Sequence, residues 1–137
     1  MKVDVFMHDG EGISWVYKNK KWVLCIKNWK PDNDINGIHC LEIHHETDEQ
    51  FILLNGKAIL LVADRNNDKF DVEMIEMEPL KVYNVPQNTW FYTITQKDTK
   101  MVYVQDAGTS IENSEFCDLS ESELMNIRKK AKEIFNK

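Results

Sequence analysis

Short apolar segments separated by turn residues run through most of the chain. Residues 70–74, Phe-Asp-Val-Glu-Met, alternate apolar and polar side chains, as a half-buried β-strand does. Residues 22–26 and 38–43 are further apolar runs of strand length. Many short strands at such regular spacing indicate a β-sandwich or a β-barrel. The pattern therefore predicts an all-β fold.

Turn residues indicate which of these strands follow one another directly. Asn-Gly at 55–56 lies between the apolar runs 51–54 and 58–62, and it suits the left-handed dihedral angles of a tight turn. We expect these two runs to form a β-hairpin. Residues 90–95 and 101–105 are separated by a Lys-Asp turn, and we expect them to form a last pair of strands.

The C-terminal segment has a helical period instead. Ser120 can cap a helix while Glu123 reaches back to it, which is a capping box. The apolar residues that follow fall on one helical face, namely Leu124, Ile127, Ala131 and Ile134. We expect a barrel over residues 1–118 and one amphipathic helix over residues 119–137, packed on the barrel or on a dimer partner.

Composition and charge narrow the classes of function. A chain of 137 residues is one domain with room for a hydrophobic core. The net charge of −6 argues against nucleic acid as a partner, and no apolar run approaches the roughly 18 residues of a membrane helix. Cys25, Cys40 and Cys117 are widely spaced, which indicates reduced thiols, and the N-terminus has no signal-peptide pattern. We therefore expect a cytoplasmic protein.

One spacing of polar residues carries the strongest signal for function. In the segment His-His-Glu-Thr-Asp-Glu-Gln-Phe-Ile-Leu-Leu-Asn-Gly, four residues separate His44 from Glu49 and six separate Glu49 from Gly56. This spacing resembles the first metal-site motif of cupins, in which a further histidine precedes the first of these residues by two positions. Glu42 occupies that position here.

A second segment about thirty residues later supports the resemblance. Pro86 fits the start of the second cupin motif, Asn88 stands where that motif has glycine, and Phe91 stands where it has its last histidine ligand. The chain thus resembles short, mostly bacterial cupin-like proteins with degenerate motifs. The resemblance implies an all-β cupin-type barrel, also called a double-stranded β-helix or jelly roll, with one C-terminal α-helix.

The resemblance also implies a homodimer. Residues 3–7 and 13–17 read as strands that would leave an edge in need of cover. A symmetric dimer would cover such an edge.

The motif residues predict one site inside the barrel. Positions two apart on a strand share a face, so Glu42 and His44 point the same way, and Glu49 on the next strand can reach the same point. Phe91 cannot coordinate a metal. We therefore expect neither a metal nor another cofactor.

Three functions are open for this site. The first is binding of a small molecule in a pocket of Glu42, His44, Glu49, Trp90, Phe91 and Tyr92. The second is a metal-independent isomerase or epimerase in which His44 and Glu49 transfer protons, with Tyr92 or Tyr103 as a further acid. The third is a metal-dependent enzyme with an atypical ligand set of Glu42, His44 and Glu49. A purely structural role for His44 and Glu49 is the remaining alternative.

Overall fold

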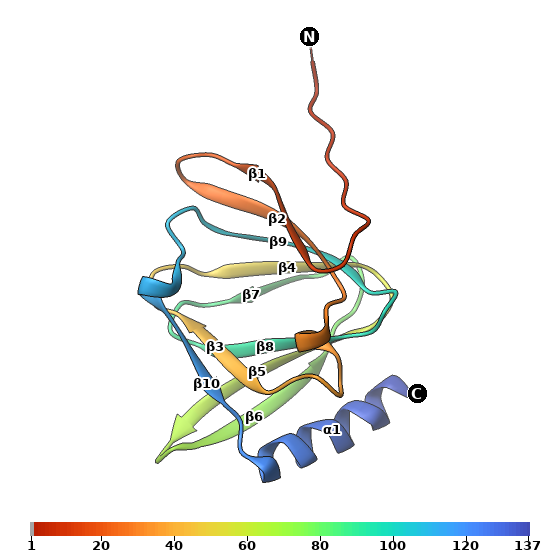
Figure 1. Ribbon diagram of the computed structural model, residues 1–137, viewed down its shortest axis with the longest axis vertical. Helices are drawn as coiled ribbons and strands as arrows, with labels where there is room; N and C mark the ends of the chain where they lie inside the picture. Colours follow the sequence, from red (N-terminus) through yellow and green to blue (C-terminus); the bar gives the residue numbers. More distant parts are fainter. Residues whose placement is uncertain (1) are drawn as a thin grey trace.

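The computed structural model describes residues 2–137 and consists of two antiparallel β-sheets packed face to face (Figure 1). A single α-helix, α1 (Glu121–Phe135), lies outside the second sheet. Two short 3-10 helices, η1 (Pro31–Asn33) and η2 (Ile111–Asn113), lie in connections. The expected all-β barrel with one C-terminal helix is confirmed.

Each sheet contains five strands, and neighbours along the chain are often in different sheets. The first sheet has the order β1 (Ile13–Lys18), β2 (Trp22–Asn28), β9 (Lys100–Asp106), β4 (Glu49–Asn55) and β7 (Val82–Val85). The second has the order β10 (Ser114–Asp118), β3 (Cys40–His44), β8 (Trp90–Thr95), β5 (Ala58–Asn66) and β6 (Lys69–Glu76). This alternation between two sheets is the topology of a jelly roll.

The hydrophobic core lies between the sheets. Phe51 of β4 and Phe91 of β8 are 2% exposed, and their rings meet edge to face with centroids 6.0 Å apart. Leu53, Leu60 and Met101 pack around them. Burying a side chain of this size stabilises the fold by roughly 1.5–3 kcal/mol, so these residues hold the two sheets together.

The C-terminal helix packs on its own barrel. Ser120 caps α1, accepting a hydrogen bond from the Glu123 backbone N–H, while the Glu123 carboxylate accepts one from Ser120, as predicted. Ile127 and Ala131 of α1 are buried against a cluster that includes Ile59 of β5. Of the two partners expected for the helix, the structure shows the barrel.

The expected hairpin at Asn-Gly 55–56 is wrong. Strand β4 lies in the first sheet and β5 in the second, so the turn carries the chain from one sheet to the other. Gly56 has a φ of +75°, and a Cβ there would lie 3.1 Å from the Asp98 carbonyl oxygen. Asn-Gly does mark a turn here, but a turn does not decide whether the strands on either side of it pair with each other.

The expected pair of residues 90–95 and 101–105 is wrong for the same reason. Strand β8 pairs with β3 and β5, whereas β9 pairs with β2 and β4. The hairpin between consecutive strands of the second sheet is β5–β6, which turns at Asn67 and Asp68 with φ of 50° and 66°.

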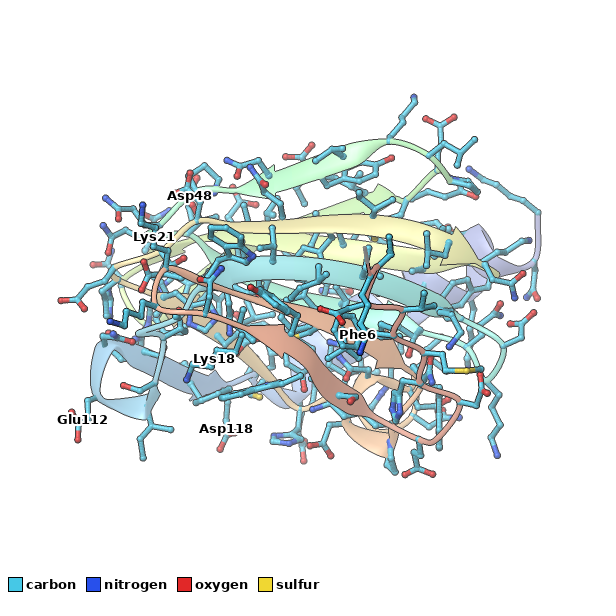
Figure 2. All side chains as sticks on the ribbon, turned by 90° about the horizontal axis from the view of Figure 1, so that it is seen from above. Phe6, Lys18, Lys21, Asp48, Glu112 and Asp118 are labelled. Carbon is cyan, nitrogen blue, oxygen red and sulfur yellow. The ribbon has the colours of Figure 1, made fainter. Side chains whose placement is uncertain are left out.

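The two ends of the barrel sequence also differ from expectation. Residues 3–7 form no strand but an extended arm that leaves the barrel, and the first strand begins at Ile13 (Figure 1). Phe6 of this arm contacts Tyr17 of β1, with ring centroids 6.1 Å apart. Figure 2 views the molecule from the side of the arm and shows Phe6 there. Strand β10, which the pattern did not predict, covers the edge of β3.

Candidate functional site

A cavity of about 230 Å³ lies between the two sheets. Ile13 of β1 and Phe116 of β10 border it, and both are partly exposed, at 37% and 59%. Because β1 and β10 are edge strands, the mouth of the cavity lies between the edges of the two sheets. Eight polar residues among those described line its wall: Lys27, Lys30, Glu42, His44, Glu49, Tyr92, Tyr103 and Gln105.

Strand alternation places these side chains. On β2, Val23, Cys25 and Lys27 are buried while the residues between them are more exposed, so Lys27 continues an inward-facing row. On the neighbouring strands, Glu49 of β4 lies directly opposite Gln105 of β9. The charged groups therefore occupy core positions of regular strands and not mobile loops.

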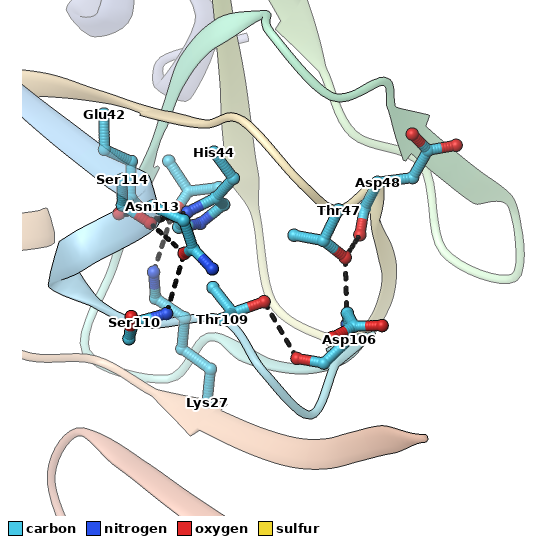
Figure 3. Close-up of polar contacts among 11 residues, drawn as sticks. Lys27, Glu42, His44, Thr47, Asp48, Asp106, Thr109, Ser110, Asn113 and Ser114 are labelled. Carbon is cyan, nitrogen blue, oxygen red and sulfur yellow. Dashed lines mark hydrogen bonds and ion pairs between the residues drawn. The ribbon is translucent and has the colours of Figure 1, made fainter. Parts of the chain in front are cut away.

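A hydrogen-bond chain orients His44. Its Nδ1 lies 2.7 Å from the Ser114 hydroxyl oxygen, which itself lies 3.5 Å from the Asn113 side-chain oxygen (Figure 3). With Ser114 taken as the donor to Asn113, its hydroxyl oxygen accepts from His44, and the imidazole proton is assigned to Nδ1. The other nitrogen, Nε2, lies 3.9 Å from a Glu42 oxygen. His44 thus presents an unprotonated Nε2 beside Glu42.

Burial favours the neutral form of His44. It lowers the pKa of the imidazole, and neighbouring His45 adds to the shift. The ring packs against Phe91 with centroids 5.5 Å apart. A neutral imidazole of this kind can accept a proton from a bound molecule.

Glu49 and Gln105 each present a buried oxygen without a hydrogen-bond partner. Glu49 is 5% exposed. Its Oε2 and the Gln105 Oε1 are buried and accept no hydrogen bond from any described residue. A buried polar atom left unpaired costs on the order of 1–3 kcal/mol, so such atoms usually have a partner.

Burial also shifts the charges of the acidic groups. Desolvation raises the pKa of Glu49 to about 8, and the nearby Glu42 carboxylate adds to the shift. Desolvation likewise raises the pKa of Glu42, although Lys27 and Lys30 oppose it. Glu49 therefore carries its proton at neutral pH and can donate it.

Lys27 is the buried cation of the cavity. It is 6% exposed, and its amine donates a 3.0 Å hydrogen bond to the Thr93 hydroxyl. Within residues 2–137, no carboxylate lies within salt-bridge distance of this amine. Burial lowers the pKa of Lys27 to about 8, against the opposing effect of Glu42 and Glu49.

The structure separates some of the residues expected to share the site. Glu42, His44, Glu49 and Tyr92 border the same cavity. Phe91 instead lies in the core beside it, and Trp90 packs against Phe70 on the helix side, 5.4 Å between ring centroids. Consecutive strand residues point to opposite faces, so residues 90–92 cannot all line one pocket.

Three polar wall residues, Lys27, Lys30 and Gln105, were not among the residues expected from the sequence. The signal for Lys27 was the alternation of β2 continued by one inward position past Cys25. The signal for Gln105 was its place two residues beyond Tyr103 on β9. Lys27 and Gln105 are polar residues at positions where strand alternation predicts a buried apolar side chain. A buried polar residue of this kind often marks a functional site.

A metal does not fit this donor set. In the described part of the chain, no three His, Cys, Asp or Glu side chains lie close enough to hold a metal ion. Phe91 has no donor atom, and the Lys27 ammonium in the same cavity repels a cation. The chemistry of the site must be derived from its own acids, bases and amine.

The fold and site together define the class of protein. A jelly roll of two five-stranded sheets with a cavity between them is the architecture found in cupins, and the chain has a cupin-type fold. No protein-family model matches it. In the described residues, no helix combines the length and apolar character needed to cross a bilayer.

Known proteins resemble the chain in sequence and in structure. Acireductone dioxygenases of Bacillus anthracis and Bacillus cereus are 29% identical to it over 84 residues, 61% of this chain and 48% of theirs. The chain thus spans about half the length of these curated relatives.

Among solved structures, Streptomyces Pac13, a nucleoside dehydratase, superposes with a TM-score of 0.56 at 12% identity, over 85% of this chain and 88% of Pac13. An RmlC-like cupin from Methanocaldococcus jannaschii superposes with a TM-score of 0.54 at 14% identity, over 77% and 90% of the two chains. KdgF from a Halomonas species gives 0.52 at 11% identity, with the same coverage. These likenesses establish the fold.

Proposed function

We propose that the protein binds a small polar organic molecule in the barrel cavity without a metal. The observation that carries this proposal is the pair of unpartnered buried oxygens, Glu49 Oε2 and Gln105 Oε1, on the cavity wall. Because both residues lie opposite each other on paired strands, one ligand can satisfy both. The ligand would supply hydrogen-bond donors such as hydroxyl groups.

The cavity limits the size of the ligand. Its volume of about 230 Å³ corresponds to about eight water molecules at their liquid volume. Pockets for drug-sized ligands usually begin at about 300 Å³. A metabolite of a few carbon atoms with several hydroxyl or carbonyl groups matches this space.

The second candidate is metal-independent proton transfer, as in an isomerase, an epimerase or a dehydratase. It is favoured because Glu49 holds a proton at neutral pH while His44 presents an unprotonated Nε2 in the same cavity. One group can donate a proton and the other can accept one, which is the pairing that general acid–base catalysis needs. The likeness to Pac13, a nucleoside dehydratase, motivates this candidate further.

A melting-temperature screen tests the binding proposal. Sugars, polyols and small hydroxy acids are added to the protein, and a binder should raise the melting temperature of the wild type. Glu49→Gln should weaken the shift, because the amide nitrogen that takes the place of Oε2 donates hydrogen bonds and cannot accept one from a ligand hydroxyl. Glu112→Gln, at an exposed position away from the cavity, is the matched control and should keep the shift. Equal shifts in all three proteins would place the ligand elsewhere.

Turnover separates the two candidates. A proton-transfer enzyme should exchange a carbon-bound hydrogen of the ligand with deuterium from the solvent, measurable by NMR. His44→Ala should abolish that exchange while leaving part of the melting shift. A binder that exchanges no hydrogen would leave the binding module as the function.

We also propose that the protein is a homodimer formed through β1 and the N-terminal arm. Strand β1 is an edge strand, and its Trp15 is 58% exposed. Val3, Val5 and Met7 are apolar residues at alternate positions of the arm, and all three are exposed, so this strand-like pattern has no partner in its own barrel. A second copy can supply both the missing strand and the apolar cover.

A further inference from the structure

We propose that the amine of Lys27 condenses with a small hydroxylated aldehyde or ketone in the cavity and holds it as an iminium. This inference rests on the proposed function and names its ligand class. It is carried by the position of the amine, which borders the same cavity as the two unpartnered oxygens. Neither the cupin motifs nor the comparisons single out this residue.

The surroundings of the amine favour reaction over ion pairing. A lysine this deeply buried is normally matched to a carboxylate, because an unpaired buried charge is costly. Here its single hydrogen-bond partner among the described residues is the neutral Thr93 hydroxyl, 3.0 Å away. That hydroxyl can accept from the ammonium or donate to the lone pair of the free amine, so the contact is compatible with both forms. Figure 3 shows the side chain reaching from β2 toward the strand of Glu42 and His44.

Burial also supplies the reactive form of the amine. With its pKa lowered to about 8, roughly a tenth of Lys27 is uncharged at pH 7. For an exposed lysine the uncharged share is below about one in a thousand. The neutral amine is the nucleophile that attacks carbonyl compounds, and desolvation is a recognised way of activating it.

The reaction balances with groups already in the cavity. The lone pair of the neutral amine forms a bond to the carbonyl carbon, and the carbonyl oxygen takes a proton from Glu49. A proton then moves from nitrogen to that oxygen, the carbon–oxygen bond breaks, and water leaves. The water contains the carbonyl oxygen, one proton from Glu49 and one from the amine. The products are a cationic iminium and a Glu49 carboxylate, so the net charge of the site is unchanged.

The remaining wall residues fit such an adduct. Gln105 Oε1 can accept a hydrogen bond from a hydroxyl group of the ligand. The new carboxylate of Glu49 and the Glu42 side chain provide negative charge near the iminium. An iminium acidifies the neighbouring C–H bond, and the unprotonated Nε2 of His44 is available to accept that proton. The inference therefore connects Lys27 to the proton-transfer candidate.

Reductive trapping tests the inference. The full chain is incubated at pH 7 with glycolaldehyde or hydroxyacetone and sodium cyanoborohydride, which delivers hydride to the iminium carbon and fixes a secondary amine. Peptide mapping by mass spectrometry then gives the labelling rate of each lysine. We expect Lys27 to be labelled at least ten-fold faster than exposed lysines such as Lys69. The inference would be overturned if Lys27 were labelled no faster than the exposed lysines. Preferred labelling of Lys30, which borders the same cavity, would overturn it as well.

Two variants guard against a trivial result. Lys27→Arg keeps the positive charge but cannot form an iminium, so fast labelling should disappear. Lys69→Met, at an exposed position on β6, should keep it. Mapping the wild type needs no variant, so the test stands even if Lys27→Arg folds poorly.

The melting screen separates this inference from the proposed function. A shift with glycerol, which has no carbonyl group, combined with no fast labelling of Lys27 would keep the binding function and reject the iminium. Absence of both effects would reject the two together.

Discussion

Lys27 and Glu49 carry opposite charges in water, and the barrel drives both toward their neutral forms. The cause is the same for each, because loss of solvent disfavours the ionised state whatever its sign. The pKa of each group moves to about 8, one from above and the other from below. Near neutral pH the cavity thus holds a proton donor and an amine that is partly free of its proton.

The pH dependence of stability tests the burial of Glu49. Its pKa is raised in the folded state, so folding binds a proton more tightly and stability falls as pH rises from about 4.5 to about 8. The slope of this contribution is at most about 1.4 kcal/mol per pH unit. Glu49→Gln removes the penalty, and we expect it to be more stable than the wild type at pH 8 by at most about 5 kcal/mol, which is this slope taken over about 3.5 pH units.

Urea unfolding at pH 5, 6, 7 and 8 measures this difference. The gain from Glu49→Gln should be close to zero at pH 5 and grow toward pH 8. Glu112→Gln is the exposed control and should show no such trend. A gain independent of pH would mean that the carboxyl group is solvated in the folded protein.

Much of the wall could be inferred from residue positions alone. Period-two alternation correctly put Glu42 and His44 on one face, and the same count extended along β2 reaches Lys27. The expectation for Trp90 failed although Trp90 shares a strand face with Tyr92, because at the start of β8 its ring packs against Phe70 in the helix-side cluster. The unpaired oxygen of Gln105 could not be read from sequence, since it depends on which strand lies across from it.

At the scale of elements, local signals determined boundaries better than partners. The capping box at Ser120 located the start of α1, because both of its hydrogen bonds join residues close in sequence. The turns at 55–56 and 97–98 were recognised, but their flanking strands belong to different sheets. Strand partners depend on contacts between distant segments, which no short window of sequence contains.

The cap of α1 has a measurable contribution to stability. Ser120→Ala leaves the Glu123 backbone N–H without its acceptor, and we expect a loss of about 1 kcal/mol. This corresponds to a decrease of about 3 °C in melting temperature. Glu123 also accepts a hydrogen bond from the Phe70 backbone N–H on β6. Loosening the first turn of α1 should therefore weaken the contact between the helix and the second sheet.

Met125→Ala, at an exposed position in the next turn of α1, is the control for this measurement. Alanine is the better helix former, so this change should be neutral or slightly stabilising. Calorimetry measures the melting temperature of both variants. Equal decreases in the two would show that the Ser120 cap makes no specific contribution to stability.

At the scale of the whole molecule, half of the large exposed apolar side chains in the described residues lie on the side of the N-terminal arm and β1. The arm and β1 lie together there, whereas the second sheet is covered by α1 (Figure 1). An unpaired edge strand beside an apolar arm invites association with another chain.

Light scattering coupled to size exclusion tests the proposed dimer. We expect the full chain to have twice the 16.1 kDa mass of one chain. Deleting residues 2–9, or introducing Trp15→Glu on the edge strand, should produce a monomer that still binds ligand. A full chain that is monomeric at tens of micromolar would reject the dimer.

The mouth of the cavity has a further consequence for how a ligand enters and leaves. Ile13 and Phe116, which border it, belong to strands that pair on one side only. Edge strands separate from a sheet at a smaller free-energy cost than central strands. The entrance can therefore open by local unfolding of β1 or β10 while the central strands stay paired. A bound molecule that contacts both edge strands would make this local opening less frequent. The amide protons of β1 and β10 would then exchange with solvent more slowly. The exchange rates of these two strands would thus report how much of the protein has ligand bound.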